Sequence, residues 1–159
     1  MNFSSFFDYD DPAAATSQSG FQLLPHWDDS AWARFFSYTE TLRYAAGAEV
    51  IRPGEHNRSL YIVDSGQLEV LISRQGRHQR LALIETGSVF GEQAFFDGRP
   101  RSARVRALSD CQLLRLGLEQ FQILSAKEGE LARDLLFDLG RLLSQRLRDT
   151  TQLLTGKGV

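Results

Sequence analysis

The chain has 159 residues, of which 42% are hydrophobic and 24% are charged, and its formal net charge is −2. This length fits one domain with its own core, and the charge balance excludes the strongly basic surface typical of a nucleic-acid-binding domain. One cysteine excludes an internal disulfide and suits a reducing cytoplasm, and no apolar run is long enough to predict a membrane-spanning helix.

The first 23 residues are expected to form a flexible tail. They are rich in Ser, Ala and Asp, and they lack the basic start and apolar centre of a signal peptide. Within them, the aromatic and acidic stretch 3–11 is either a docking peptide or, more simply, an unstructured leader. Residues 28–38 (DDSAWARFFSY) then begin with carboxylates and carry aromatic residues at helical spacing, which predicts a short helix.

A β pattern follows between residues 42 and 116. Short apolar runs are each bounded by glycine, proline or polar turn residues, at 48–54, 59–66, 67–73, 80–87, 103–108 and 111–116. Several short strands at this spacing predict an all-β barrel or jelly roll. Cys111 lies in the last of these runs and is expected to act as a small buried hydrophobic residue.

Two helices are predicted after this β region. Residues 118–126 form a short one, and residues 130–154 carry leucines at spacings of three and four, which is typical of a long amphipathic helix. Gly140 interrupts the long helix at a cost of about 1 kcal/mol, and marks either a kink or a close helix contact. The fold class predicted is therefore mainly β with flanking helices, a double-stranded β-helix of the jelly-roll type followed by a long C-terminal helix.

The stretch 90–106, FGEQAFFDGRPRSARVR, combines groups that suit a small sugar phosphate. Gly91 allows backbone to approach an anion without a Cβ clash, and a helical turn after it would point N–H groups at that anion. Arg101 offers a planar fork to two phosphate oxygens, and Ser102 adds a hydroxyl donor. The Glu92 carboxylate would repel an anion, so it is expected to contact another group of the ligand. Accepting a hydrogen bond from a ribose 2′-hydroxyl is such a role.

The Phe-Gly-Glu-x-Ala run at 90–94 and the Pro-Arg-Ser-Ala run at 100–103 resemble the phosphate-binding cassette of cyclic nucleotide-binding domains. This family includes catabolite activator proteins and the regulatory subunits of cAMP-dependent protein kinase. The resemblance covers residues 24–154, including PGE at 53–55 and SLYIVDSGQLEVLI at 59–72. It implies a β-roll flanked by helices over 24–154, with a short tail at 155–159.

The resemblance also implies roles for the cassette residues. Gly91 and Ala94 are expected to offer backbone contacts to the ligand. Glu92 is expected to bind the ribose 2′-hydroxyl. Arg101 and Ser102 are expected to bind the cyclic phosphate.

Four further positions resemble those that surround the base in this family. Val70 and Leu81, on barrel strands, correspond to positions that pack beside it. Thr150 and Thr151, late in the long helix, stand where catabolite activators offer two hydroxyl groups to the adenine amine. Adjacent helix residues point about 100° apart, so one threonine faces its own barrel and the other faces a partner helix. This arrangement predicts cAMP as the ligand, with cGMP as the weaker one.

A parallel homodimer that pairs the long helices of two chains would bring these threonines to the bound ligand. Its heptad seam is expected to consist of Leu136, Leu139, Leu143, Thr150 and Leu153. Arg146 interrupts that seam, which leaves open the alternative of a monomer whose threonines face only water.

The sequence thus predicts a cytoplasmic cAMP receptor that signals through contacts with an effector protein and binds neither DNA nor membrane. Two alternatives stay open: a domain of the same fold that binds no nucleotide, and a part of a longer cAMP-dependent transcription regulator. A catalytic role is not expected, because no nucleophile has an activating base nearby. A cofactor or metal is not expected either, because His26, His56 and His78 are dispersed.

Overall fold

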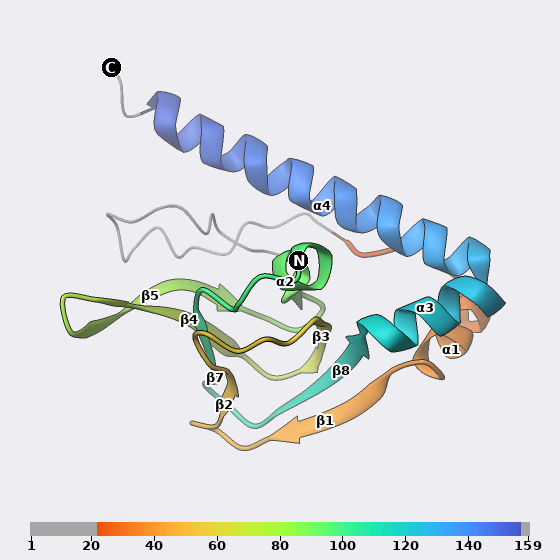
Figure 1. The fold of residues 1–159 in the computed structure, drawn as a ribbon, viewed down its shortest axis with the longest axis horizontal. Coiled ribbons are helices and arrows are strands. Elements are labelled where there is room, and N and C mark those ends of the chain that lie inside the picture. The colour runs from red at the N-terminus through yellow and green to blue at the C-terminus, as the bar shows by residue number, and fades with distance from the viewer. Residues whose placement is uncertain (1–21, 157–159) are drawn as a thin grey trace.

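The structure is a computed structural model that describes residues 22–156. Two antiparallel sheets of four strands each form a β-roll, with the helices gathered beside it (Figure 1). The first sheet has the order β1-β8-β3-β6, comprising Glu40–Tyr44, Cys111–Gly117, Ser59–Ser65 and Val89–Phe90. The second has the order β2-β7-β4-β5, comprising Glu49–Ile51, Arg104–Ala107, Leu68–Arg74 and Arg77–Ile84.

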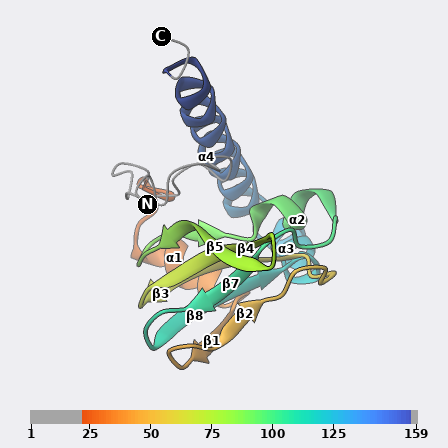
Figure 2. The same ribbon diagram turned by 90° about the vertical axis from the view of Figure 1, so that its left-hand side faces the viewer.

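The helices are α1 (Asp29–Phe36), α2 (Glu92–Asp97), α3 (Leu118–Lys127) and α4 (Gly129–Gly156). Helix α4 leaves the roll at an angle, and its C-terminal half projects away from the sheets (Figure 2). The predicted fold class is confirmed. The sequence missed β1, whose ETLRY segment is mostly exposed and carries no apolar run, and β6, which has only two residues.

The first hydrophobic core lies between the inner faces of the two sheets. Tyr61 of β3 and Phe90 of β6 stack there with ring centroids 4.9 Å apart. Cys111 lies in the same core with 5% exposure, as the sequence predicts, and burial raises the pKa of its thiol. The interior of the roll is therefore filled by side chains rather than left as a channel.

A second core joins the helices to the outer face of the first sheet. Leu60 of β3 points outward into this core, where it joins Phe35 of α1 and Leu135 of α4. Leu23 and Leu24 are buried there as well, although the sequence placed residue 23 in the tail. The first half of α4 is thus part of the domain core.

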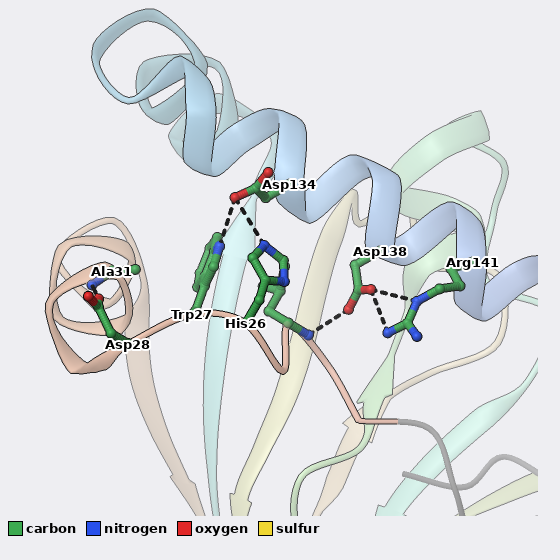
Figure 3. Close-up of polar contacts among 8 residues, drawn as sticks. His26, Trp27, Asp28, Ala31, Asp134, Asp138 and Arg141 are labelled. Carbon is green, nitrogen blue, oxygen red and sulfur yellow. Dashed lines mark hydrogen bonds and ion pairs between the residues drawn. The ribbon is translucent and has the colours of Figure 1, made fainter.

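Polar contacts fasten the chain before α1 to this first half of α4 (Figure 3). Asp134 accepts a hydrogen bond of 3.0 Å from Trp27 Nε1 and lies 3.3 Å from His26 Nε2. The bond from Trp27 lowers the pKa of Asp134. Asp138, which is buried, accepts a 2.6 Å bond from the Leu24 N–H. The first half of α4 is therefore held by hydrogen bonds in addition to apolar packing.

Gly140 neither breaks α4 nor lies against another part of residues 22–156. The helix continues through it, and a Cβ added there would meet no atom within 4 Å. A close contact inside the chain is thus excluded for the described residues, and the glycine lies on the exposed face.

Gly66, in the turn between β3 and β4, provides a stability test of this fold. Its φ is +97°, and a Cβ there would lie 2.5 Å from Cys111 Cβ. Gly76 has a φ of +75° but open space around it. We expect Gly66→Ala to lower the free energy of unfolding by about 3 kcal/mol, because backbone strain and overpacking add, and Gly76→Ala by about 1 kcal/mol. Urea denaturation measures both, and equal losses would contradict the packing described around Cys111.

Candidate ligand-binding site

A cavity of about 260 Å³ opens between α2, the loop that follows it, and the strands of the second sheet. This volume is near the lower end of ligand-binding pockets, which begin at roughly 300 Å³. Its apolar wall includes Ile51, Val70 and Val105, from three neighbouring strands. Its polar wall contains every cassette residue predicted from the sequence: Gly91, Glu92, Ala94, Arg101 and Ser102.

Gly91 is the residue before α2, and its backbone has a left-handed conformation with a φ of +81°. A Cβ at this position would lie 2.8 Å from the Ser59 carbonyl oxygen and 3.2 Å from the Tyr61 ring. No other residue fits this close approach without displacing β3. The glycine therefore sets where α2 begins relative to the barrel.

Arg101 lies deep in the cavity wall with 7% exposure. Its Nη1 donates to the Gly91 carbonyl at 2.9 Å and its Nη2 to the Ser59 carbonyl at 2.7 Å, whereas its Nε has no partner. Burial lowers the pKa of Arg101. Among residues 22–156 no carboxylate forms an ion pair with it. The guanidinium is thus oriented by backbone oxygens, and it carries its positive charge beside the cavity without a carboxylate in direct contact among the described residues.

Glu92 is 1% exposed and forms a buried ion pair with Arg146 of α4 through its Oε1. Arg146 also donates to the Val89 carbonyl at 3.1 Å. Burial lowers the pKa of Arg146, and the Glu92 carboxylate partly offsets that effect. Glu92 Oε2 is buried without a hydrogen-bond partner. One carboxylate oxygen therefore remains to accept a proton donor in the cavity.

Arg146 is a buried partner of the cassette that the sequence interpretation missed. It was treated as an interruption of the dimer seam, yet it lies on the buried face of α4 with Leu139 and Leu142, which are 0% and 3% exposed. The spacing 139, 142, 146 was the available signal, because it places all three on one helix face. Leu139 is consequently a core residue, and its assignment to an exposed seam was wrong. The Leu153 side chain lies outside the described part of the structure.

Three of the remaining predicted site residues do not line the cavity in the single chain. Leu81 is 6% exposed and belongs to the barrel core beside Val70. Thr150 and Thr151 lie on the projecting half of α4, where each donates a 2.9 Å hydrogen bond to the carbonyl four residues earlier. Contact between these threonines and a base stays a prediction.

The cassette helix also contacts α3. Phe95 is 2% exposed and packs edge-on against Phe121 with ring centroids 5.5 Å apart. This ring contact joins α2 to α3.

A metal centre has no support in the described range. The histidines named above are not brought together, and between residues 22 and 156 no three His, Cys, Asp or Glu side chains gather closely enough to hold a metal ion. In the same range, every helix is too short or too polar to cross a membrane.

Comparison with known proteins agrees with the fold and the cassette. The family model for the cyclic nucleotide-binding domain matches residues 41–128, more than half of the chain. The cAMP-activated global transcriptional regulator Vfr of Pseudomonas aeruginosa is 28% identical over 124 residues, which are 75% of this chain and 56% of Vfr. The cyclic AMP receptor protein of Thermus thermophilus is 32% identical over 114 residues, which are 71% of this chain and 51% of that protein.

The crystal structure of the Thermus thermophilus catabolite activator protein superposes with a TM-score of 0.75 at 28% identity, covering 84% of this chain and 61% of that one. The chain spans about half the length of these curated relatives, which are named as transcriptional regulators or as a cyclic AMP receptor protein. With the two four-stranded sheets, the cassette and the long C-terminal helix all in place, the matched residues show that this chain belongs to the cyclic nucleotide-binding domain family.

Proposed function

We propose that this chain is a cAMP receptor module without catalytic activity. The observation that carries the proposal is the buried guanidinium of Arg101, which faces a cavity and has no carboxylate partner among the described residues. A buried charge is unfavourable unless an opposite charge compensates it. The single negative charge of a cyclic phosphate compensates Arg101 with the least disturbance of its two backbone contacts.

The other groups of the cavity complement the rest of a cyclic nucleotide. The partnerless Glu92 Oε2 accepts the ribose 2′-hydroxyl while Oε1 stays paired with Arg146. Ser102, which is exposed, donates its hydroxyl to the phosphate, and the backbone around Gly91 and Ala94 approaches the sugar phosphate closely. The ligand thereby satisfies an acceptor and a cation that the protein alone leaves unsatisfied.

A second part of the proposal concerns the exposed face of α4. An apolar row runs along it at alternating spacings of four and three: Leu136, Gly140, Leu143, Leu147, Thr150 and Leu154. Leu136, Leu147 and Leu154 are 40%, 67% and 71% exposed. Such spacing is that of a coiled-coil seam, and Gly140 allows two helices to approach closely. The row forms a parallel homodimer contact. It keeps Leu136, Leu143 and Thr150 of the seam first expected, and Gly140 and Leu154 replace Leu139 and Leu153 in it.

In that dimer Thr150 lies in the seam and Thr151 beside it, so the two hydroxyl groups stand where two chains meet. There the two hydroxyl groups contact the base of the nucleotide, and Val70 and Leu81 lie behind the base in the barrel. A threonine hydroxyl that accepts a hydrogen bond from the adenine amine favours cAMP over cGMP. The output of the module passes through the projecting half of α4 to an effector protein.

Binding of cAMP by the wild type and by Arg101→Ala tests the main proposal. We expect the substitution to weaken binding about 100-fold, because the phosphate loses a buried charge-assisted partner. Arg77→Ala is the control: it removes the same charge from an exposed position at the start of β5, outside the cavity lining, and should change the affinity less than about threefold. Isothermal titration calorimetry with cAMP and cGMP measures both. A wild type that binds neither ligand would instead favour an interaction module that binds no nucleotide.

The contact between α4 and the cassette is tested by a double-mutant cycle on Glu92 and Arg146. Either Glu92→Gln or Arg146→Met alone should lower the free energy of unfolding by about 3 kcal/mol, because it leaves a buried charge without its partner. The double variant should lose at least about 1 kcal/mol less than the sum. The exposed pair Arg34–Glu128 is the control and should couple by less than about 0.5 kcal/mol. Additive losses at Glu92 and Arg146 would show that the pair does not form in solution.

The dimer is tested by placing a charge in the exposed row. Leu147→Glu should convert the dimer to a monomer, since two like charges would face each other across the seam. Arg148→Glu, an exposed neighbour outside the row, should leave the dimer intact. Light scattering with cAMP present gives the mass of each variant, and a monomeric wild type would refute the contact.

A further inference from the structure

Arg58, in the turn before β3, reaches across to the C-terminal end of the cassette helix α2. Its Nε and Nη2 donate to the Phe95 carbonyl at 3.2 and 2.9 Å, and Nη2 also donates to the Phe96 carbonyl at 2.8 Å. The last carbonyls of a helix have no partner within it, and a cation there also interacts favourably with the helix dipole. Arg58 therefore acts as a side-chain cap on a helix of only six residues.

The turn after α2 is shaped around this side chain. Gly98 ends the helix with a φ of +68°, and a Cβ there would lie 3.3 Å from Arg58 Nη1. The glycine thus leaves room for the guanidinium as well as permitting the left-handed turn. From this point the chain enters the loop that carries Arg101 and Ser102.

The backbone of the same residue holds a second helix. The Arg58 carbonyl accepts a 3.1 Å hydrogen bond from the N–H of Leu118, the first residue of α3. The next carbonyl along the chain, that of Ser59, is one of the two that orient Arg101. Two consecutive residues therefore fix the end of α2, the start of α3 and the cation of the proposed phosphate site.

We infer that Arg58 is a positioning residue for the ligand site, and that it ties the position of the cassette helix to that of α3. The inference rests on the proposed cAMP binding. A single helical turn is not stable by itself, so α2 depends on external contacts to hold Glu92 at one end and the phosphate loop at the other. Without the Arg58 cap, the cassette occupies its binding-competent arrangement for a smaller fraction of the time, and the apparent Kd rises in proportion.

If Arg58 only stabilised the fold, its removal would lower Tm and leave the affinity for the ligand unchanged. Arg58 is an exposed side chain outside both hydrophobic cores, so its removal takes little from the stability of the roll. A loss of global stability also leaves Kd unchanged as long as the protein is folded at the temperature of the titration. A change in affinity without a large change in Tm is therefore the signature of positioning.

The experiment compares the wild type, Arg58→Lys, Arg58→Ala and Arg52→Ala by calorimetric titration with cAMP, with Tm measured for each. Arg58→Ala should bind about tenfold more weakly, equivalent to about 1.4 kcal/mol. Arg58→Lys keeps the charge but loses the fork that spans two carbonyls, so it should bind about threefold more weakly. Arg52 is the matched control, since its side chain is 71% exposed in the same connection between β2 and β3, and Arg52→Ala should bind within about twofold of the wild type.

Hydrogen exchange without ligand separates this inference from the proposed function. Arg58→Ala should speed exchange in residues 95–98 and at the start of α3, whereas Arg52→Ala should not. If the wild type fails to bind cAMP, the proposed function is wrong, and faster exchange in these two segments still supports the positioning role. Unchanged exchange there, or unchanged affinity in Arg58→Ala beside a wild type that binds, overturns the inference.

Discussion

The carbonyl contacts of Arg101 are the constraint on which the site depends. One guanidinium bridges the Gly91 carbonyl of the cassette and the Ser59 carbonyl of β3, so it fixes the distance between a short helix and the barrel. This is also why position 91 must be glycine, since a Cβ would strike the same Ser59 oxygen. Because backbone oxygens are neutral, they orient the guanidinium without cancelling its charge. The same residue can therefore join the cassette to the barrel and keep a positive charge beside the cavity.

Helix α4 connects to the domain in two different ways along its length. Its first half is held by apolar packing and by Asp134 and Asp138 (Figure 3), and these contacts lie away from the cavity. Beyond Leu142, Arg146 forms a buried ion pair with Glu92 of the cassette. A buried ion pair contributes little net stability when made and costs much when half of it is lost. The projecting half of α4 is thus sensitive to anything that changes the surroundings of Glu92.

Sequence was sufficient where the determining residues are close together along the chain. The cassette groups fall within residues 90–103, and the apolar runs and glycine turns marked most strands, so the roll and the cavity residues could be predicted. Strand β1 could not, because its residues are mostly exposed and its pairing comes from β8, about seventy residues later. Arg58 could not either, since its partner lies 37 residues away and such a contact leaves no local pattern. For Arg146 the spacing along α4 indicates the buried face, but not its partner Glu92, which lies 54 residues away.

The two apolar rows of α4 also show why local sequence patterns are insufficient to predict contacts between distant residues. One row, with Leu135, Leu139 and Leu142, is buried, and the other, with Leu136 and Leu147, is exposed. Both rows consist largely of leucines at spacings of three and four, so hydrophobicity alone does not show which row faces the barrel. The continuation of the buried row at residue 146 decides it, because an arginine on a buried face requires a carboxylate opposite. The cassette supplies that carboxylate as Glu92, and the remaining row is then the one that stays exposed on this chain.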